Sequence, residues 1–179
     1  MKIEITPLSY TNTVNGITQS LPVNRNEFFF MNWEEGKHES SIGFPGGKNY
    51  TCSRNYDYTE PVYTVTEYDR DRIIKEMDID VSKVDAHNAT FPEMYALSNY
   101  LDDNGYTDRF SFEVSGALRD IVGLDNSVAF TDVRLDYYDS LYKTMEFLRS
   151  KGFYDSYLSI KRFFDYYDEQ KISVPSLLL

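Results

Sequence analysis

TFPEMYALSNYLDDNG, residues 90–105, contains the start, the apolar face and the end of one helix. Thr90 and Glu93 have the spacing of a capping box, and Pro92 falls in the first turn, where its missing N–H costs least. Asn104 and Gly105 supply the stop. The apolar positions recur at helical spacing: Met94, Leu97 and Leu101. The stretch therefore predicts a helix with one buried face.

Helical periodicity continues on both sides of this stretch. It predicts helices at about 67–77, 112–122, 137–150 and 156–169, with Gly123 and Gly152 as stops. A strand is expected at 128–133. The predicted inward residues are Val114, Leu118, Ile121, Val122, Leu141, Met145, Leu148, Ile160, Phe163, Phe164 and Tyr167. Leu177, Leu178 and Leu179 form an apolar tail that we expect to dock on this chain or on a second copy.

The first 66 residues have the pattern of strands and turns. Ile3 and Ile5 alternate with polar neighbours, and Asn15-Gly16 is a strong hairpin signal. Phe28–Trp33 is an aromatic run, 45–47 reads as a turn, and 62–66 resumes a strand pattern, whereas 48–60 gives no clear assignment. The sequence thus predicts an α+β fold, with a small antiparallel β-sheet before a mainly helical acidic part. The boundary is expected between 1–66 and 67–179, either as two lobes or as one continuous domain.

The charge is strongly negative, with a net value of -11 and a pI near 4.6. Residues 67–179 carry 13 basic and 22 acidic residues, which is most of this excess. Direct nucleic-acid binding requires clustered Lys and Arg, so we expect none, and a basic protein partner fits better. The alternative is that the charge serves solubility alone.

The cellular location is inferred from what the sequence lacks. Cys52 is the single cysteine, which excludes an internal disulfide. No segment has the apolar character of a signal peptide or of a membrane span. We therefore expect a cytoplasmic protein that does not bind membranes.

Motifs for catalysis fit poorly. Residues 43–49 resemble a phosphate loop, but the glycine spacing is one residue short and Asn49 replaces the magnesium-binding hydroxyl. His38 and His87 lie in polar segments without a nucleophile motif, and Asp85 beside His87 gives too few ligands for zinc. We expect no enzymatic activity, no cofactor and no metal.

Asp-Tyr-Tyr-Asp occurs twice, at 136–139 and at 165–168, within the last two predicted helices. Helical residues three or four apart have Cβ atoms ~5–6 Å apart, a distance comparable to that between successive phosphates of a DNA strand. Rows of carboxylates can thus imitate phosphates, and tyrosines add contact area. Asp136 can instead cap its helix, and one Tyr of each pair can point inward. The predicted partner-binding residues are Asp102, Asp103, Asp136, Asp139, Asp155, Asp165, Tyr166, Asp168 and Glu169.

Two stretches resemble the ArdA-type antirestriction proteins, which are acidic, dimeric DNA mimics encoded on mobile elements. Residues 90–103 are similar to that family's capped acidic helix. Leu141 to Gly152, followed by Tyr157-Leu158 and Phe163-Phe164-Asp165-Tyr166, is similar to its C-terminal helix, glycine break and aromatic segment. Together they cover about a third of the chain. The resemblance implies a small acidic protein of a phage or plasmid, and a homodimer. If a phage encodes it, the expected location is the host cytoplasm.

The sequence as a whole favours a non-enzymatic inhibitor that occupies the basic nucleic-acid groove of a host defence nuclease, a restriction or CRISPR effector, as a nucleic-acid mimic. One alternative is an immunity-type or adaptor protein that binds its partner through aromatic hot spots. The other is a metal-dependent enzyme that uses the paired aspartates, because carboxylates three apart on a helix can share a magnesium ion.

Overall fold

A computed structural model describes residues 11–14, 17–20, 32–34, 37–44, 46–123 and 130–172, and their side chains from residue 39 to residue 170. The predictions for Ile3, Ile5, Phe28 and the tail 177–179 lie outside these residues. The strands are β1 Thr11–Val14, β2 Ile17–Ser20, β3 Asn32–Glu34, β4 Lys37–Gly43, β5 Lys48–Arg54, β6 Val62–Asp69 and β7 Arg72–Asp80. A short 3₁₀ helix, η1 Val81–Lys83, precedes the helices α1 Phe91–Asp103, α2 Phe110–Val122, α3 Tyr137–Lys151 and α4 Tyr154–Ile172.

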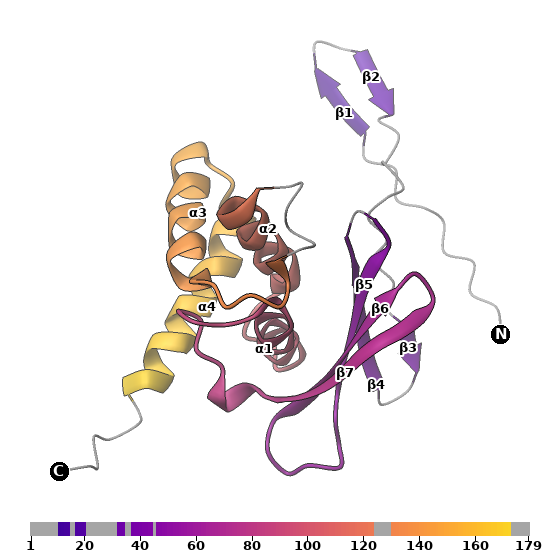
Figure 1. The fold of residues 1–179 in the computed structure, drawn as a ribbon. Coiled ribbons are helices and arrows are strands. Elements are labelled where there is room, and N and C mark those ends of the chain that lie inside the picture. The colour runs from indigo at the N-terminus through magenta and orange to yellow at the C-terminus, as the bar shows by residue number, and fades with distance from the viewer. Residues whose placement is uncertain are drawn as a thin grey trace.

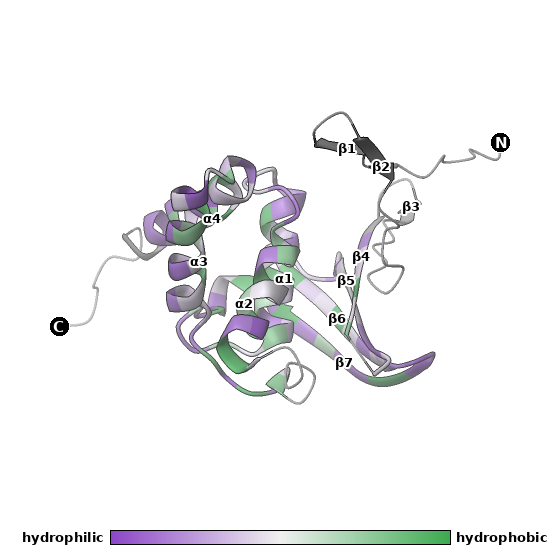
Figure 2. Cartoon of the chain, turned by 90° about the horizontal axis from the view of Figure 1, so that it is seen from above, coloured by the Kyte–Doolittle hydropathy of each residue, from purple (hydrophilic) through white to green (hydrophobic). Residues whose placement is uncertain are grey.

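The predicted α+β class is confirmed. Strands β3 to β7 form one antiparallel sheet in the order β3-β4-β5-β6-β7 (Figure 1). The helices pack on one side of this sheet (Figure 2). Strands β1 and β2 pair with Val14 opposite Ile17, so the hairpin predicted from Asn15-Gly16 is confirmed. Glycines 46 and 47, both with positive φ, lie in the predicted turn between β4 and β5.

The helix predicted at 67–77 is wrong. These residues belong to β6, to a turn at Arg70, whose φ is 55°, and to β7. Ile73 and Met77 have helical spacing, but β6 pairs with β5 along seven residue pairs, and this tertiary pairing overrides local periodicity. The boundary expected after Thr66 falls inside β6, which runs to Asp69.

The strand expected at 128–133 is also wrong where the structure describes it, because Phe130–Val133 forms turns. Residues 128 and 129 lie outside the described part. The segment that gave no assignment, 48–60, contains β5.

One hydrophobic core lies between the sheet and the helices. Tyr50, Cys52 and Val65 face it from the sheet, and none exposes more than 1% of its surface. Phe91 of α1 joins the two layers, because its ring contacts Tyr50 at 5.3 Å and stacks on Tyr95. At about 25 cal/mol per Å² of buried apolar surface, these aromatic side chains are major stabilising contacts.

The helix signals read from the sequence are largely confirmed. Thr90 and Glu93 form the capping box of α1, and Met94, Leu97 and Leu101 are buried. Gly123 ends α2 and Gly152 ends α3, with φ of 82° and 77°. The four inward residues predicted for the last helix are buried: Ile160, Phe163, Phe164 and Tyr167. Ile121 is the exception, since it is 37% exposed.

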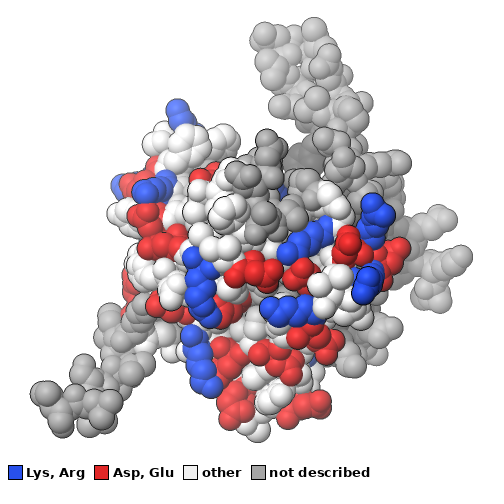
Figure 3. All heavy atoms as spheres, viewed as in Figure 1, with Lys and Arg blue, Asp and Glu red and all other residues white. Residues whose placement is uncertain are grey.

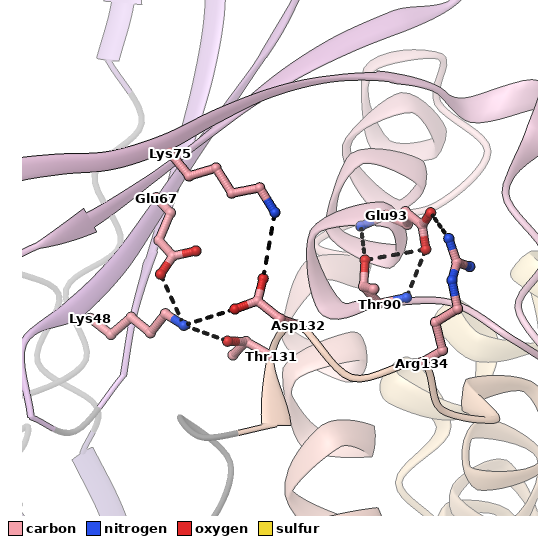
Figure 4. A network of polar contacts seen from close by, with 8 residues as sticks. All are labelled: Lys48, Glu67, Lys75, Thr90, Glu93, Thr131, Asp132 and Arg134. Atoms are coloured by element: carbon pink, nitrogen blue, oxygen red, sulfur yellow. Dashed lines mark hydrogen bonds and ion pairs between the residues drawn. The ribbon is translucent and has the colours of Figure 1, made fainter.

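A polar network fastens the segment before α3 to the sheet and to α1 (Figure 4). The Lys48 ammonium pairs with the buried Glu67 carboxylate at 2.9 Å and donates to the Thr131 hydroxyl at 2.7 Å. Asp132 lies 3.7 Å from the same ammonium and 3.8 Å from that of Lys75. Although burial alone would lower it, the pKa of Lys48 is raised by the hydrogen bond to Glu67.

The other half of the network holds the start of α1. Arg134 donates to the Glu93 carboxylate at 2.7 Å and to the Asn88 carbonyl at 2.6 Å, while Ala89 and Leu135 form a β-bridge. The segment that leads into α3 is therefore held by contacts to the sheet and to the start of α1. No helix in the described part of the chain has the length and apolar character to cross a membrane.

Candidate partner-binding surface

The two Asp-Tyr-Tyr-Asp copies meet in space. The Tyr138 hydroxyl of the first copy donates to the Asp168 carboxylate of the second at 3.2 Å. The Tyr138 and Tyr167 rings lie 5.7 Å apart, which places the start of α3 against the C-terminal half of α4. The sequence contains a signal for this contact. Asp136 and Asp168 each lie 16 residues from Gly152, so a helical hairpin with its turn at Gly152 brings them together.

The loop before α1 completes this surface. The Tyr167 hydroxyl donates to the Asp85 carboxylate at 2.8 Å and accepts the Ala86 N–H at 2.9 Å. The His87 ring lies over Tyr138, with centroids 4.3 Å apart, and its Nδ1 is 3.3 Å from Asp136. We call this group the junction surface and define it by Asp85, His87, Asp136, Tyr138 and Asp168. All but the half-buried Tyr138 are exposed.

Asp136 also has the capping role expected from the sequence, because its carboxylate accepts the Asp139 N–H at 2.9 Å at the start of α3. Negative charge is favourable at a helix N-terminus. The contacts shown to Asp136 and Asp168 come from the Asp139 N–H, the His87 ring and the Tyr138 hydroxyl, and none comes from a lysine or an arginine.

Asp139 and Asp165 differ from these two in their environment. Asp139 pairs with Lys143 at 2.5 Å, and Asp165 pairs with Lys161 at 2.6 Å, both at the i,i+4 spacing of helix surface pairs. Each motif copy thus has one carboxylate at the junction surface and one that is neutralised by a lysine.

Asp102 and Asp103, predicted as part of the acidic surface, contact other elements of the fold. The half-buried Asp102 carboxylate accepts the Phe110 N–H at 3.0 and 3.2 Å and the Thr107 hydroxyl at 2.7 Å. Asp102 therefore caps α2 in place of the N-cap residue Arg109, which makes no side-chain capping bond. Burial raises the pKa of Asp102. The exposed Asp103 accepts the Tyr63 hydroxyl at 2.8 Å.

The remaining predicted residues occupy α4. Tyr166 packs on Tyr106 and Tyr100, with ring centroids 4.7 and 6.1 Å away. Glu169 directly follows Asp168 in α4 and is exposed. Asp155 lies at the opposite end of α4 and lines an open groove of about 690 Å³ between α2 and α4, with Arg109, Phe112, Leu158 and Arg162. The half-buried Glu113, whose pKa is raised by burial, lines the same groove.

The negative charge is not concentrated on the last two helices. Between residues 137 and 172 the chain has six acidic and six basic residues. Figure 3 shows acidic and basic side chains interspersed on the face in view. Lysines and arginines thus lie among the carboxylates that could form rows, and the junction surface is the clearer acidic feature.

A cluster of exposed aromatic rings lies at the turn between α3 and α4, and the sequence interpretation did not single it out. Phe147, Phe153 and Tyr154 are 56%, 60% and 64% exposed, and the Lys151 ammonium lies 5.8 Å from the Phe147 ring. Phe147 falls outside the apolar stripe formed by Leu141 and Met145. That departure from the helical period was the available signal.

The described residues offer little for metal or nucleophilic chemistry. No group of three or more His, Cys, Asp or Glu residues among them could hold a metal ion. Cys52 is buried and burial raises the pKa of its thiol, so the thiolate is disfavoured.

Comparison of the chain with protein-family models, with curated proteins and with solved structures finds no match. The two stretches from which the sequence analysis inferred a resemblance to ArdA-type proteins lie in α1 and in α3 and α4, and no comparison tests that inference.

Proposed function

We propose that this chain is a non-enzymatic acidic inhibitor that binds the basic nucleic-acid groove of a host defence nuclease as a nucleic-acid mimic. The observation that carries the proposal is the meeting of the two Asp-Tyr-Tyr-Asp copies at the junction surface. It combines exposed carboxylates at Asp85, Asp136 and Asp168 with the ring of Tyr138. Such a surface complements a groove built from Lys and Arg.

The internal contacts of the surface support this function. The Tyr138 hydroxyl, the Tyr167 hydroxyl and the α3 N-terminus hold the three carboxylates in place before a partner arrives. A preorganised surface loses less conformational entropy on binding.

Salt dependence and competition by nucleic acid test the class of function. The full chain is immobilised and exposed to a bacterial lysate at low salt, and bound proteins are eluted with duplex DNA. A nuclease subunit displaced by the DNA is expected, and its binding should weaken steeply with salt as screening shortens the range of charge attraction. A captured partner that DNA does not displace would contradict mimicry.

Two matched double variants test the surface itself. Asp136→Asn with Asp168→Asn removes two charges from the junction surface, whereas Asp139→Asn with Asp165→Asn removes the same number from lysine-paired positions. Asn also caps helices well, so α3 should persist in both. We expect at least about tenfold weaker binding, or about 1.4 kcal/mol, for the first variant and under about threefold for the second. Equal losses would mean that total charge, not this surface, drives binding.

A second candidate function is an adaptor or immunity-type protein that binds through aromatic contacts. The exposed rings of Phe147, Phe153 and Tyr154 support it, because aromatic side chains dominate interface hot spots. Phe147→Ser with Phe153→Ser should then abolish capture of the partner at both low and high salt, while the Asp136→Asn/Asp168→Asn variant binds normally. The mimic function predicts the reverse order.

A further inference from the structure

The open groove between α2 and α4 has a volume of about 690 Å³. This volume lies within the ~300–1,000 Å³ of ordinary ligand sites, so the groove has room for a short ligand. The side chains that decide its chemistry recur three or four positions apart and so come from one face of each helix. They are Arg109, Phe112 and Glu113 at the start of α2, and Asp155, Leu158 and Arg162 in the first half of α4.

The two helices run in opposite directions along the groove. At one end the Ser159 hydroxyl donates to the Asp108 carbonyl at 3.2 Å. Farther along, Ser156 is hydrogen-bonded to the Glu113 carboxylate. Residue numbers thus rise on α2 where they fall on α4. The start of α2 therefore faces the middle of α4, and the next turn of α2 faces the start of α4.

Charge is separated along the groove. Among the described residues that line it, Arg109 and Arg162 are the only basic ones, and they lie toward the end where Asp108 is the one carboxylate. Toward the other end are the carboxylates of Glu113 and Asp155, with no basic lining residue of the described chain beside them. The groove therefore has a positive end and a negative end.

Apolar surface separates the two ends. Phe112 and Leu158 are 40% and 43% exposed, and in the sequence each lies between a basic and an acidic lining residue of its own helix. Covering exposed apolar side chains is favourable. A ligand that fills the groove would therefore have an apolar group between its two ends.

The arginines of the groove differ from the other cations of the helices. Lys143, Arg149 and Lys161 each pair with a carboxylate three or four residues away on their own helix. In the part of the chain that the structure describes, Arg109 and Arg162 form no such pair, and both are exposed. Their guanidinium groups can therefore bind a carboxylate from outside, for which the planar fork of arginine is well suited.

Arg109 also has an unusual backbone conformation. Its φ is 56°, in the left-handed region that is uncommon and unfavourable for residues other than glycine. It is the N-cap residue of α2, yet its side chain makes no capping hydrogen bond. Its position thus has a conformational cost that no side-chain contact to the described residues offsets. Backbone outliers of this kind concentrate at ligand sites.

The charges of the groove limit what it can bind. A ligand with negative charge alone fits poorly, because three of the lining residues are acidic. A peptide with both signs of charge fits better, and the helix rise of 1.5 Å per residue sets its length. The arginine and the carboxylate ends lie about 6 Å apart along α2 and about 10 Å apart along α4. An extended peptide rises about 3.3 Å per residue, so its two charged residues would be two or three positions apart.

We propose that the groove between α2 and α4 binds an extended peptide segment of a partner protein. An acidic side chain of the segment pairs with the two arginines, a basic side chain pairs with the carboxylates at the other end, and an apolar side chain between them covers Phe112 and Leu158. The site is separate from the junction surface, which takes Asp168 from the second half of α4. It therefore does not depend on the inhibitor function.

Three blocked tetrapeptides test the proposal: Glu-Leu-Leu-Lys, Glu-Leu-Leu-Glu and Lys-Leu-Leu-Lys. Each is titrated into the full chain while backbone amide chemical shifts are followed by NMR. We expect the mixed-charge peptide to shift the amides of residues 109–113 and 155–162. It should bind at least about fivefold more tightly than either peptide with one sign of charge, because only it complements both ends.

Two matched double variants locate the binding. Arg109→Asn with Arg162→Gln removes the unpaired arginines, and Asn is among the residues that best tolerate the left-handed conformation, so α2 should persist. Lys143→Gln with Lys161→Gln removes the same charge from paired positions. The first variant should bind the mixed-charge peptide at least about tenfold more weakly than the wild type, and the second within about twofold.

Asp136→Asn with Asp168→Asn should bind the mixed-charge peptide like the wild type, which separates this site from the junction surface. Equal affinity for the three peptides overturns the proposal, as does the absence of shifts in the groove at millimolar peptide. Groove amides that shift with protein concentration alone also overturn it, since a second copy would then occupy the groove. Groove amides of the free chain that shift in Leu178→Ser do so as well, because the chain's own C-terminal residues would be the occupant.

Discussion

Replacing Asp102 by Ala should destabilise the protein, although the residue lies in the last turn of α1 and is only half-buried. The change removes the acceptor of the Phe110 N–H, which is at the fully buried first residue of α2 and has no other cap. Leaving a buried donor unpaired costs about 1–3 kcal/mol, and loss of a helix cap costs about 1 kcal/mol on its own. We expect a loss of about 2 kcal/mol in the free energy of unfolding, equivalent to about 4–8 °C in Tm for a chain of this length.

Asp102→Asn separates the cap from the charge. Asn retains one carbonyl oxygen for the Phe110 N–H, so the loss at neutral pH should be under about 1 kcal/mol. Burial raises the folded-state pKa of Asp102 above its unfolded value of about 3.9, so the folded state binds more protons in that range. The stability of the wild type relative to Asp102→Asn should therefore be greatest below the unfolded pKa and fall as pH rises through the folded one.

Urea denaturation followed by far-UV circular dichroism, between about pH 4 and about pH 7, measures both effects. Asp71→Ala is the matched control, because this aspartate is exposed in the turn between β6 and β7. Its free energy of unfolding should stay within about 0.5 kcal/mol of the wild type. The reasoning fails if Asp102→Ala behaves like this control, or if the wild type gains stability over Asp102→Asn as pH rises.

Three further substitutions test other contacts. Lys48→Met should lower the free energy of unfolding by about 3 kcal/mol in urea titrations, because it leaves the buried Glu67 carboxylate unpaired. The double variant Lys48→Met with Glu67→Leu should recover most of this loss. A loss below about 1 kcal/mol for Lys48→Met alone would contradict the pairing. Gly152→Ala should cost about 1 kcal/mol in thermal melts, since φ is 77° there, and an unchanged Tm would argue against that conformation. Phe147→Ser should change the free energy of unfolding by less than about 0.5 kcal/mol, and a larger loss would show that the ring is packed.

Helix boundaries were predictable because their signals are local. The capping box at Thr90 and the stops at Gly123 and Gly152 each depend on residues within one or two turns, and the structure confirms them. Strand β7 was missed for the opposite reason. Strand β7 pairs with β6, which in turn pairs with β5. A short stretch of sequence around Ile73 and Met77 contains neither partner strand, and these two residues also fit helical spacing.

The candidate site shows the same difference between contacts that are local in the sequence and contacts that are not. The capping role of Asp136 followed from its position before α3, whereas the role of Asp102 depends on the start of α2, eight residues farther along the chain. That contact requires the loop to turn at Gly105 and Arg109, both with positive φ. For a non-glycine residue such as Arg109 this conformation is uncommon, so nothing in the sequence indicated it.

Because the single cysteine is buried, the labelling of its thiol can report on the opening of the folded core. Cys52 lies in β5, pairs with Val65 of β6 across the sheet, and is 1% exposed in the core between the sheet and the helices. A thiol reagent can reach it only when the sheet separates from the helices, and with no second cysteine the labelling signal has one origin. The rate of modification in the absence of denaturant therefore reports how often the core opens, without any engineered label.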